Sequence, residues 1–345
     1  ANAKALVVLK RAEAFKPSDP KLQLRLADGF NLLGASDKAT QAYSALLKQL
    51  PPEAPMRDQV RAKLADIYLR GSDRQHAREQ LEAIIHDDPG NALAYYYLGN
   101  IALDQNQMEK AADYFSKTIL FQPDFGQAYY DLANAQLSLK KPSLALDTLE
   151  QARKRFSQNF VLEYLTAVAE SMEKHYEEAI KHFTAAEVVA RATNPERLTG
   201  FFYFQVGGTY ERKGDYAQAE KYLEKSLQLQ PDFPAAMNYL GFMWAEHGMK
   251  LERARELIAK AVKADPGNSA YLDSMAWVLY KMNQPKAALE YMLKAMANME
   301  EPDATMYDHL GDIYAALHEP VKAHDAWHKS ANIAPNAEVE KKLKA

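Results

Sequence analysis

The chain has 345 residues, of which 48% are apolar and 26% are charged, and its formal net charge is −4. This balance is ordinary for a globular protein, and it lacks the basic excess that a nucleic-acid or anionic-membrane partner attracts. No segment approaches the ~18 consecutive apolar residues of a membrane span, so we expect no direct insertion into a membrane. Because the chain has no cysteine, disulfides, thiolate zinc sites and a cysteine nucleophile are excluded.

The sequence repeats a pattern at intervals of 34 to 40 residues. A small residue marks each unit, at Ala27, Ala65, Gly99, Ala133, Ala167, Gly207, Gly241, Ala276 and Gly311. An alanine follows twelve or thirteen residues later, and a large apolar residue comes four positions after that, as in Ala111 and Phe115. Proline closes most units. Each unit therefore predicts two amphipathic helices that approach closely at their small residues, and the units must stack to bury their apolar faces.

The segment YYYLGNIALDQNQMEKAADYFSKTILFQPD, residues 95–124, shows the pattern most fully. It resembles the tetratricopeptide repeat almost throughout, and the resemblance extends over essentially the whole chain. It implies an all-α fold, a right-handed superhelical solenoid of about nine helix-turn-helix repeats plus a leading half-repeat. Other stretches are similar to long bacterial repeat proteins, some of them envelope-associated. A bacterial source is indicated, and the compartment stays open between the cytoplasm and the periplasm or cell envelope.

In the frame of that family, we predict a single array over residues 1–345. Residues 1–17 fit only the second helix of a truncated repeat, so we expect the chain to be a fragment of a longer protein. Extra residues at 54–57 and 194–199 are loop variation, or, for 194–199, a bend or a contact of the superhelix. Residues 338–345 are predicted to form a polar helix that caps the last apolar face. Full repeats are predicted to start near Pro20, Asp58, Ala92, Gly126, Phe160, Gly200, Pro234, Ser269 and Ala304.

Motifs that would indicate catalysis or a cofactor are weak. Gly207 and Gly208 lie within a predicted helix, where they cannot form a phosphate-binding loop. His324 and His328 are one helical turn apart, but no third metal ligand accompanies them. No combination of nucleophile, base and orienting group is evident. We therefore expect no enzyme activity, no metal and no cofactor in this chain.

The first helix of each unit has a second face, opposite the one that packs against its partner helix. In tetratricopeptide proteins that face lines a concave groove in which partner peptides bind. Tyr95 falls on the packing face and is predicted to contact its own second helix, whereas Tyr96 and Tyr97 flank the groove, with Tyr96 preferred. Asp273, Asp308 and Asp312 predict an acidic C-terminal part of the groove. The predicted peptide-binding residues are Tyr96, Tyr97, Asn100, Tyr130, Asn134, Tyr164, Phe204 and Asn238.

The leading functional hypothesis is a non-catalytic scaffold that binds a partner protein or an extended peptide in the concave groove. Rings at Tyr96, Tyr130, Tyr164 and Phe204 would stack on the ligand, and asparagines beside them would bind its backbone. Two alternatives stay open for the apolar groove residues: self-association into a homo-oligomer, and packing inside a tight superhelix. A third possibility is that the array is the recruiting arm of a larger protein whose catalytic domain lies elsewhere.

Overall fold

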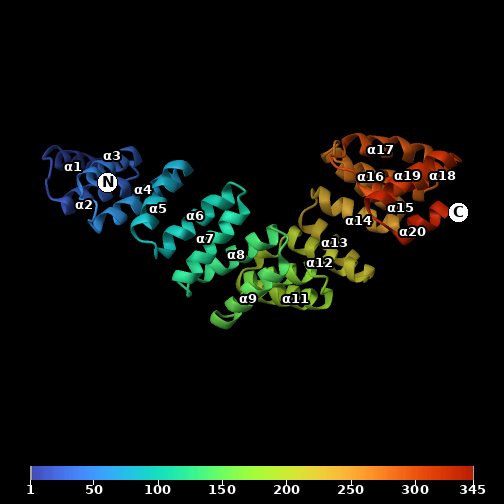
Figure 1. Ribbon diagram of the computed structural model, residues 1–345, viewed down its shortest axis with the longest axis horizontal. Coiled ribbons are helices and arrows are strands. Elements are labelled where there is room, and N and C mark those ends of the chain that lie inside the picture. Colours follow the sequence, from blue (N-terminus) through green and yellow to red (C-terminus); the bar gives the residue numbers. More distant parts are fainter. Residues whose placement is uncertain (1, 345) are drawn as a thin grey trace. The chain divides into compact units, whose positions relative to one another are not determined.

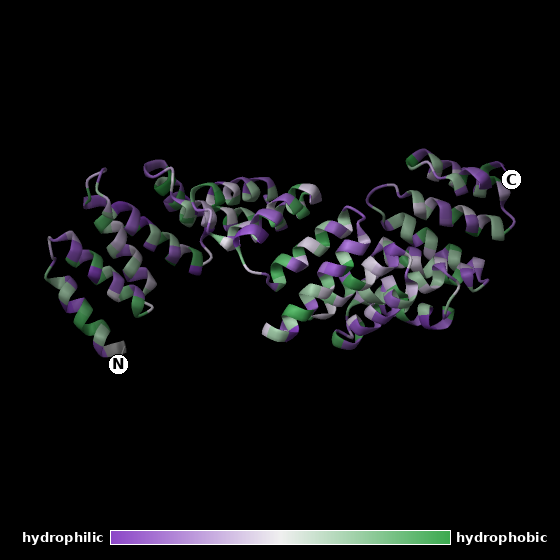
Figure 2. Ribbon diagram, turned by 90° about the horizontal axis from the view of Figure 1, so that it is seen from below, coloured by the Kyte–Doolittle hydropathy of each residue, from purple (hydrophilic) through white to green (hydrophobic). Residues whose placement is uncertain are grey.

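The computed structural model describes residues 2–344, which form twenty α-helices and one short 3₁₀ helix and include no β-strand. The chain packs as two compact units, residues 1–175 and residues 176–345. Within each unit, successive helices lie beside one another in chain order, as the colours of Figure 1 show. Each helix carries both hydrophobic and hydrophilic residues along its length, which is the amphipathic character expected of stacked helix pairs (Figure 2).

The first unit contains ten helices among its described residues. They are α1 (Asn2–Ala14), α2 (Pro20–Leu32), α3 (Ser36–Gln49), α4 (Met56–Arg70), α5 (Arg74–Asp87), α6 (Ala92–Asp104), α7 (Met108–Phe121), α8 (Gly126–Ser138), α9 (Pro142–Arg155) and α10 (Phe160–Met172). The first helices of the repeats begin at the predicted starts, except that α4 begins at Met56, two residues before Asp58.

The second unit contains ten α-helices and the 3₁₀ helix among its described residues. They are α11 (Tyr176–Thr193), η1 (Pro195–Arg197), α12 (Gly200–Lys213), α13 (Tyr216–Leu229), α14 (Pro234–Glu246), α15 (Leu251–Ala264), α16 (Ser269–Lys281), α17 (Pro285–Asn298), α18 (Ala304–Ala316), α19 (Pro320–Ile333) and α20 (Ala337–Lys344). The 3₁₀ helix η1 lies in the extra segment 194–199, and α20 covers the predicted capping tail apart from residue 345, which lies outside the described residues.

Close approach between the two helices of a repeat explains the small residue in each first helix. A Cβ atom added to Gly99 would lie 2.6 Å from the ring of Phe115, and one added to Gly311 would lie 2.4 Å from the Trp327 indole. Both distances are far below van der Waals contact, so no larger residue fits without displacing the aromatic ring. The predicted pairing of a small residue with a large apolar one is confirmed at these positions.

Local signals in the sequence set the helix ends. Asn91 begins α6 by accepting a hydrogen bond from the Ala94 amide through its side chain, and Asp303 begins α18 in the same way through the Met306 amide. The turn between the two helices of a repeat passes through a left-handed residue, for example Asn106 with φ of 57° and Gly214 with φ of 89°. Short, defined turns of this kind fix which face of each first helix points away from its second helix.

None of the helices that the structure describes is both long and apolar enough to traverse a membrane.

Candidate functional site

The candidate site lies on the surface of the first helices that points away from their second helices, which we call the first-helix face. Tyr95 of α6 lies on the opposite side of the helix. It is buried, and its ring stacks on Phe121 at 5.7 Å and lies 6.2 Å from Tyr114, both on α7. The prediction that Tyr95 packs against its own second helix is confirmed.

Tyr96 joins two neighbouring repeats. Its half-buried ring lies 4.6 Å from Phe125 and 5.7 Å from Phe115, and its hydroxyl donates to Asp131 Oδ2 of α8 at 3.0 Å. Burial raises the pKa of the Asp131 carboxyl, although hydrogen bonds from Gln127 and Tyr96 oppose the shift. Both the ring and the hydroxyl of Tyr96 therefore have partners within the chain.

Tyr97 is the exposed member of the three consecutive tyrosines. Its exposed fraction is 39%, and that of Leu93, one turn earlier on α6, is 48%. Both side chains line an open pocket of about 490 Å³ between α4 and α6, which we call the Tyr97 pocket. Its other lining residues are Asn31, Asp58, Gln59, Ala62, Lys63, Ala65, Asp66, Leu69, Leu81, Ile84, Asn91 and Ala94.

The charged groups at the rim of the Tyr97 pocket are paired. Lys63 Nζ lies 3.3 Å from Asp28 Oδ1, and Arg70 donates to Asp66 Oδ2 at 2.9 Å and to Asn31 Oδ1 at 2.6 Å. Asp58, which also lines the pocket, accepts a hydrogen bond from Arg61 at 3.0 Å. The pocket therefore offers an apolar wall beside polar groups and charges that have partners within the chain. This is the usual composition of a recognition site for an apolar side chain.

The α4 side of this pocket was not predicted from the sequence, because Ala62 and Leu69 are ordinary helix residues. The α6 side could have been predicted from the spacing of Leu93 and Tyr97. Two large apolar residues one turn apart, on the side of α6 away from Tyr95, mark an apolar stripe that the helix pair itself does not bury.

The other predicted residues of the first unit differ in how accessible they are. Asn134 of α8 is exposed, whereas Asn100 is half-buried and donates to the Tyr96 carbonyl at 3.0 Å. Tyr130 has only 8% of its surface exposed, and its hydroxyl accepts a hydrogen bond from Asn159 at 2.7 Å. The half-buried Tyr164 stacks on Phe160 at 5.6 Å, and burial raises its pKa to about 12. The side chain of Tyr130 therefore serves the packing of its repeat.

Two predicted residues, Phe204 and Asn238, lie in the second unit. Phe204 is half-buried against Phe233 at 5.2 Å and Tyr239 at 5.5 Å, and Phe201 beside it is exposed. Asn238 is half-buried, and its Oδ1 atom has no hydrogen-bond partner. These residues form a second, smaller group on the first-helix face of that unit.

Internal packing, one of the alternatives left open for the apolar groove residues, holds for Trp277. Its buried indole stacks on His309 at 3.9 Å and donates to Glu246 at 2.6 Å. His309 in turn lies 2.9 Å from Asp273, measured from Nδ1 to Oδ1, and both side chains are buried. Trp277 is therefore part of the core of the second unit.

The predicted acidic surface at the C-terminal end of the groove is wrong. Asp273 is buried beside His309, and Asp308 and Asp312 both pair with Lys342 of α20. The sequence predicted an acidic surface because the basic partners of these carboxylates lie about one repeat further along the chain. The partner is His309 for Asp273 and Lys342 for Asp308 and Asp312.

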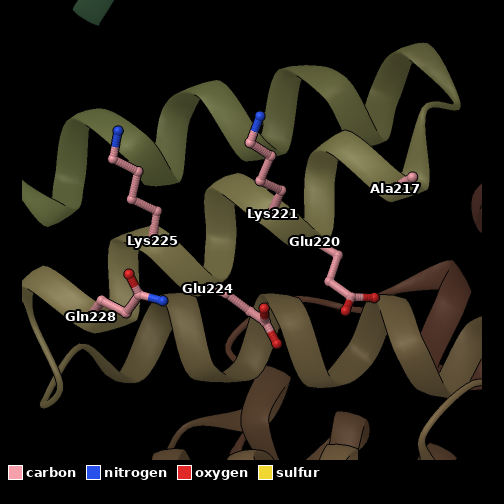
Figure 3. Close-up of a pocket in the computed structure, with 6 residues that line it drawn as sticks. All are labelled: Ala217, Glu220, Lys221, Glu224, Lys225 and Gln228. Carbon is pink, nitrogen blue, oxygen red and sulfur yellow. The ribbon is translucent and has the colours of Figure 1, made fainter.

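The second unit also has an open pocket, which lies along α13 (Figure 3). Lys221 and Lys225 point to one side of the helix, while Glu220 and Glu224 point to the other. Lys225 pairs with Glu187 of α11 at 3.2 Å, Glu224 pairs with Arg253 of α15 at 3.3 Å, and Glu220 pairs with Lys250. These ion pairs join three second helices, so this pocket is part of the stacking surface and is not a candidate binding site.

The glycine pair and the histidine pair that were considered as cofactor or metal motifs lie in helices of the second unit. Gly207 and Gly208 lie inside α12, as predicted. The rings of His324 and His328 stack at 6.3 Å, and His328 is hydrogen-bonded to Asn332. Within residues 2–344, no group of three or more potential ligands is placed to hold a metal ion.

The model of the tetratricopeptide repeat matches residues 62–129, 130–195 and 209–269, together more than half of the chain. The chain belongs to the tetratricopeptide repeat family. Proteins of this family generally mediate protein–protein interactions, and the family and its fold are of a scaffold type that is generally non-catalytic.

Relatives of this tetratricopeptide repeat chain occur in Pseudomonas aeruginosa and in Caenorhabditis elegans. A TPR repeat-containing protein of Pseudomonas aeruginosa is 27% identical over 64% of this chain and 36% of its own length. The BBSome complex member bbs-4 of Caenorhabditis elegans is 23% identical over 71% of this chain and 53% of its own length. The chain thus spans between about a third and a half of the length of these relatives.

Among solved structures, the APC/C hetero-tetramer Cut9-Hcn1 is similar in fold. The match covers 94% of this chain and 75% of that one, with a TM-score of 0.60 and 15% identity. At this identity the likeness supports the α-solenoid fold alone.

Proposed function

We propose that this chain is a scaffold that binds a partner protein through a peptide segment lying on the first-helix face of residues 1–175. An apolar side chain of that segment fills the Tyr97 pocket. The observation that carries the proposal is the exposure of Leu93 and Tyr97 at the mouth of a pocket of about 490 Å³, beside two tyrosines that are packed within the chain.

The energetics favour an apolar anchor with polar surroundings. Covering a Leu and a Tyr side chain removes apolar surface from water, which contributes about 25 cal/mol for each Å² buried. Asn31, Gln59 and Asn91 surround this surface. The Gln59 amide can donate to and accept from an extended backbone, whereas the Asn91 side chain caps α6 and Asn31 Oδ1 accepts from Arg70. Such an arrangement, with a central aromatic anchor and a polar rim, is typical of protein interfaces.

The remaining predicted residues take different parts in this proposal. Asn134 is exposed on α8 and extends the contact along the first-helix face, whereas Tyr96, Asn100 and Tyr130 position that face through their contacts within the chain. In the second unit, Phe204, Asn238 and the neighbouring Phe201 provide a separate contact with the partner protein. Tyr164 keeps the ligand-stacking role predicted for it.

The two relatives described above support a scaffold in general terms. One of them, by its name, is a member of the BBSome complex. The chain spans only part of these relatives, and we propose for it the recruiting role alone.

A direct test measures peptide binding at the Tyr97 pocket. Peptides are first selected from a random display library against the native chain, and their dissociation constants are then measured by fluorescence anisotropy. We expect a Leu93→Ala, Tyr97→Ala double variant to bind the selected peptides at least about tenfold more weakly, because each lost apolar contact is worth roughly 1 kcal/mol or more.

The matched control is Leu120→Ala, which removes an exposed leucine from the second helix α7. It should bind like the native chain. Unchanged binding by the double variant, with an unchanged circular dichroism spectrum, would refute the site. Sedimentation of the native chain over a wide concentration range tests self-association, and an oligomer that the double variant loses would make the Tyr97 pocket a subunit interface instead.

A further inference from the structure

The third repeat packs a tyrosine ring between its two helices, near the start of α6. The ring belongs to Tyr95, the fourth residue of α6, and it stacks on Phe121 at 5.7 Å and lies 6.2 Å from Tyr114. The ammonium of Lys117, on α7 like these two rings, lies 5.6 Å from the centroid of the Tyr95 ring. The chain itself therefore fills the space between the start of the first helix and the end of the second.

Other repeats use a tyrosine at the same position. Tyr203, the fourth residue of α12, stacks on Tyr222 of α13 at 6.1 Å, and the ammonium of Lys225 lies 3.7 Å from the centroid of the Tyr203 ring. The hydroxyl of Tyr129, the fourth residue of α8, donates to the carbonyl of Pro123, just before that repeat, at 3.1 Å. A phenol thus supplies both the ring and the hydrogen-bond donor at this place in the repeat.

The first repeat has a pocket at the equivalent place. Helices α2 and α3 have the same lengths as α6 and α7, and the fourth residue of α2 is Gln23. Ala42 and Ala45 stand in α3 where α7 has a tyrosine and a lysine. These smaller side chains leave an open pocket of about 420 Å³, which we call the Gln23 pocket. Its other lining residues are Glu13, Lys16, Pro17, Ser18, Leu26, Leu46 and Gln49.

The amide of Gln23 has one atom that lacks a partner. Its Nε2 donates to the Pro17 carbonyl at 2.8 Å and to Gln49 Oε1 at 3.0 Å, so this amide uses the same carbonyl that a tyrosine hydroxyl uses in the fourth repeat. Its Oε1 is buried and has no hydrogen-bond partner among the described residues. Buried acceptors without a donor are rare because they are costly. The Gln23 pocket therefore lacks an aromatic ring and a hydrogen-bond donor, which are the two things that a phenol provides.

We propose that the Gln23 pocket binds the tyrosine side chain of a segment of a partner protein. The ring fills the space beside Ala42 and Ala45, and the hydroxyl donates to Gln23 Oε1. Lys16 and Ser18 are exposed around the pocket, and their polar groups can bind the backbone of the segment that carries the ring. The Gln23 pocket shares no lining residue with the Tyr97 pocket and does not depend on it.

The first experiment measures recognition of the ring and of its hydroxyl. The probes are N-acetyl-L-tyrosinamide and N-acetyl-L-phenylalaninamide, titrated into the full chain while NMR follows the methyl signals of Ala42 and Ala45. The native chain should bind the tyrosine probe at least about fivefold more tightly, because one hydrogen bond to a buried acceptor distinguishes the two. A Gln23→Met variant keeps the space and lacks the acceptor, so it should bind both probes alike.

A second variant closes the pocket without removing a core residue. Gln23→Tyr places in the first repeat the residue that other repeats have there, so the variant should fold and should not bind either probe. Loss of folding in this variant would show that the pocket has no room for a ring and would overturn the proposal. Equal binding of the two probes by the native chain, or binding that survives in Gln23→Tyr, would also overturn it.

The controls test the place and the source of the ligand. The methyl signal of Ala62, in the Tyr97 pocket, should not follow the titration, and a parallel shift there would show unspecific binding of rings. Peptides selected from a random display library against the native chain, and depleted against Gln23→Tyr, should share a tyrosine. Selected peptides without one would overturn the assignment to a tyrosine. A native dimer that Gln23→Tyr loses would make a second copy the occupant and overturn the assignment to a partner protein.

Discussion

The hydroxyl of Tyr96 donates to Asp131 of the next repeat at 3.0 Å, so one of three consecutive tyrosines holds two repeats together. Asp131 is half-buried, and its other hydrogen bond comes from Gln127 of its own helix. Neighbouring repeats are thus joined by a specific polar contact in addition to apolar packing.

Removing this contact should destabilise the first unit. Tyr96→Phe deletes a hydrogen bond to a partly buried carboxylate, and we expect the free energy of unfolding to fall by about 1–3 kcal/mol. Urea denaturation followed by circular dichroism measures this change. Tyr97→Phe is the control and should change stability by less than about 0.5 kcal/mol, as is usual for exposed sites. Equal stability of Tyr96→Phe and the native chain would contradict the assignment of Tyr96.

The contact between Gly99 and Phe115 predicts an effect of overpacking. Gly99→Ala places a methyl group 2.6 Å from the Phe115 ring, and we expect a loss of about 1–3 kcal/mol in the free energy of unfolding. Combining it with Phe115→Leu should cost less than the two single changes together, because the smaller side chain makes room. Gly90→Ala is a matched control, since its nearest neighbour would lie at 3.5 Å. Strict additivity of the pair would show that the contact is not tight.

Glu187 predicts a dependence of stability on pH. Burial would raise the pKa of its carboxyl, but hydrogen bonds from Arg191, Tyr203 and Lys225 outweigh burial and hold the pKa below the ordinary value of 4.5. The stabilisation is therefore complete above about pH 4.5, where the carboxyl is ionised in both states, and is lost as the pH falls through the lower pKa of the folded state.

The measurement compares the native chain with Glu187→Gln by urea denaturation at several pH values from 7 to 3. The difference in the free energy of unfolding should be constant at the upper end and should shrink below about pH 4.5. Glu256→Gln, at an exposed position of α15, should show no such trend. A difference that grows toward acid would reverse the assigned sign.

The buried pair of Asp273 and His309 predicts strong coupling between α16 and α18. His309→Ala leaves a buried carboxyl without its partner and removes the ring that stacks on Trp277, so we expect a loss of about 2–5 kcal/mol. Adding Asp273→Asn should recover part of that loss, because the neutral amide is less costly to bury. Thermal denaturation followed by tryptophan fluorescence measures both variants. No recovery in the double variant would show that the two residues do not interact.

The fold could be predicted from the sequence because each repeat has the same pattern of residues at the same spacing. The small residue, the alanine and the large apolar residue recur in register, and the pairs Gly99–Phe115 and Gly311–Trp327 are in contact as that register requires. Helix starts followed for the same reason, since side-chain caps such as Asn91 act on residues only three positions away.

The site could be predicted only in part, because the contacts that decide it lie between repeats. The helical period places Tyr96 and Tyr97 on either side of the groove and does not choose between them. Phe125, at the start of α8, and Asp131 within α8 contact Tyr96, and no local pattern in the sequence marks these contacts. The same holds for Asp308 and Asp312, whose partner Lys342 is 34 and 30 residues away and carries no local signal.

The ion pairs along α13 have a consequence for how such a chain can grow in length. The lysines of α13 point to one side of the helix and its glutamates to the other, with Lys225 pairing to α11 and Glu224 to α15 (Figure 3). A tandem duplicate of this repeat, stacked next to the original in the same way, would place the basic edge of one copy against the acidic edge of the other. Duplication at this point therefore creates no clash of like charges along α13, and one repeat can be added there while these charges stay matched.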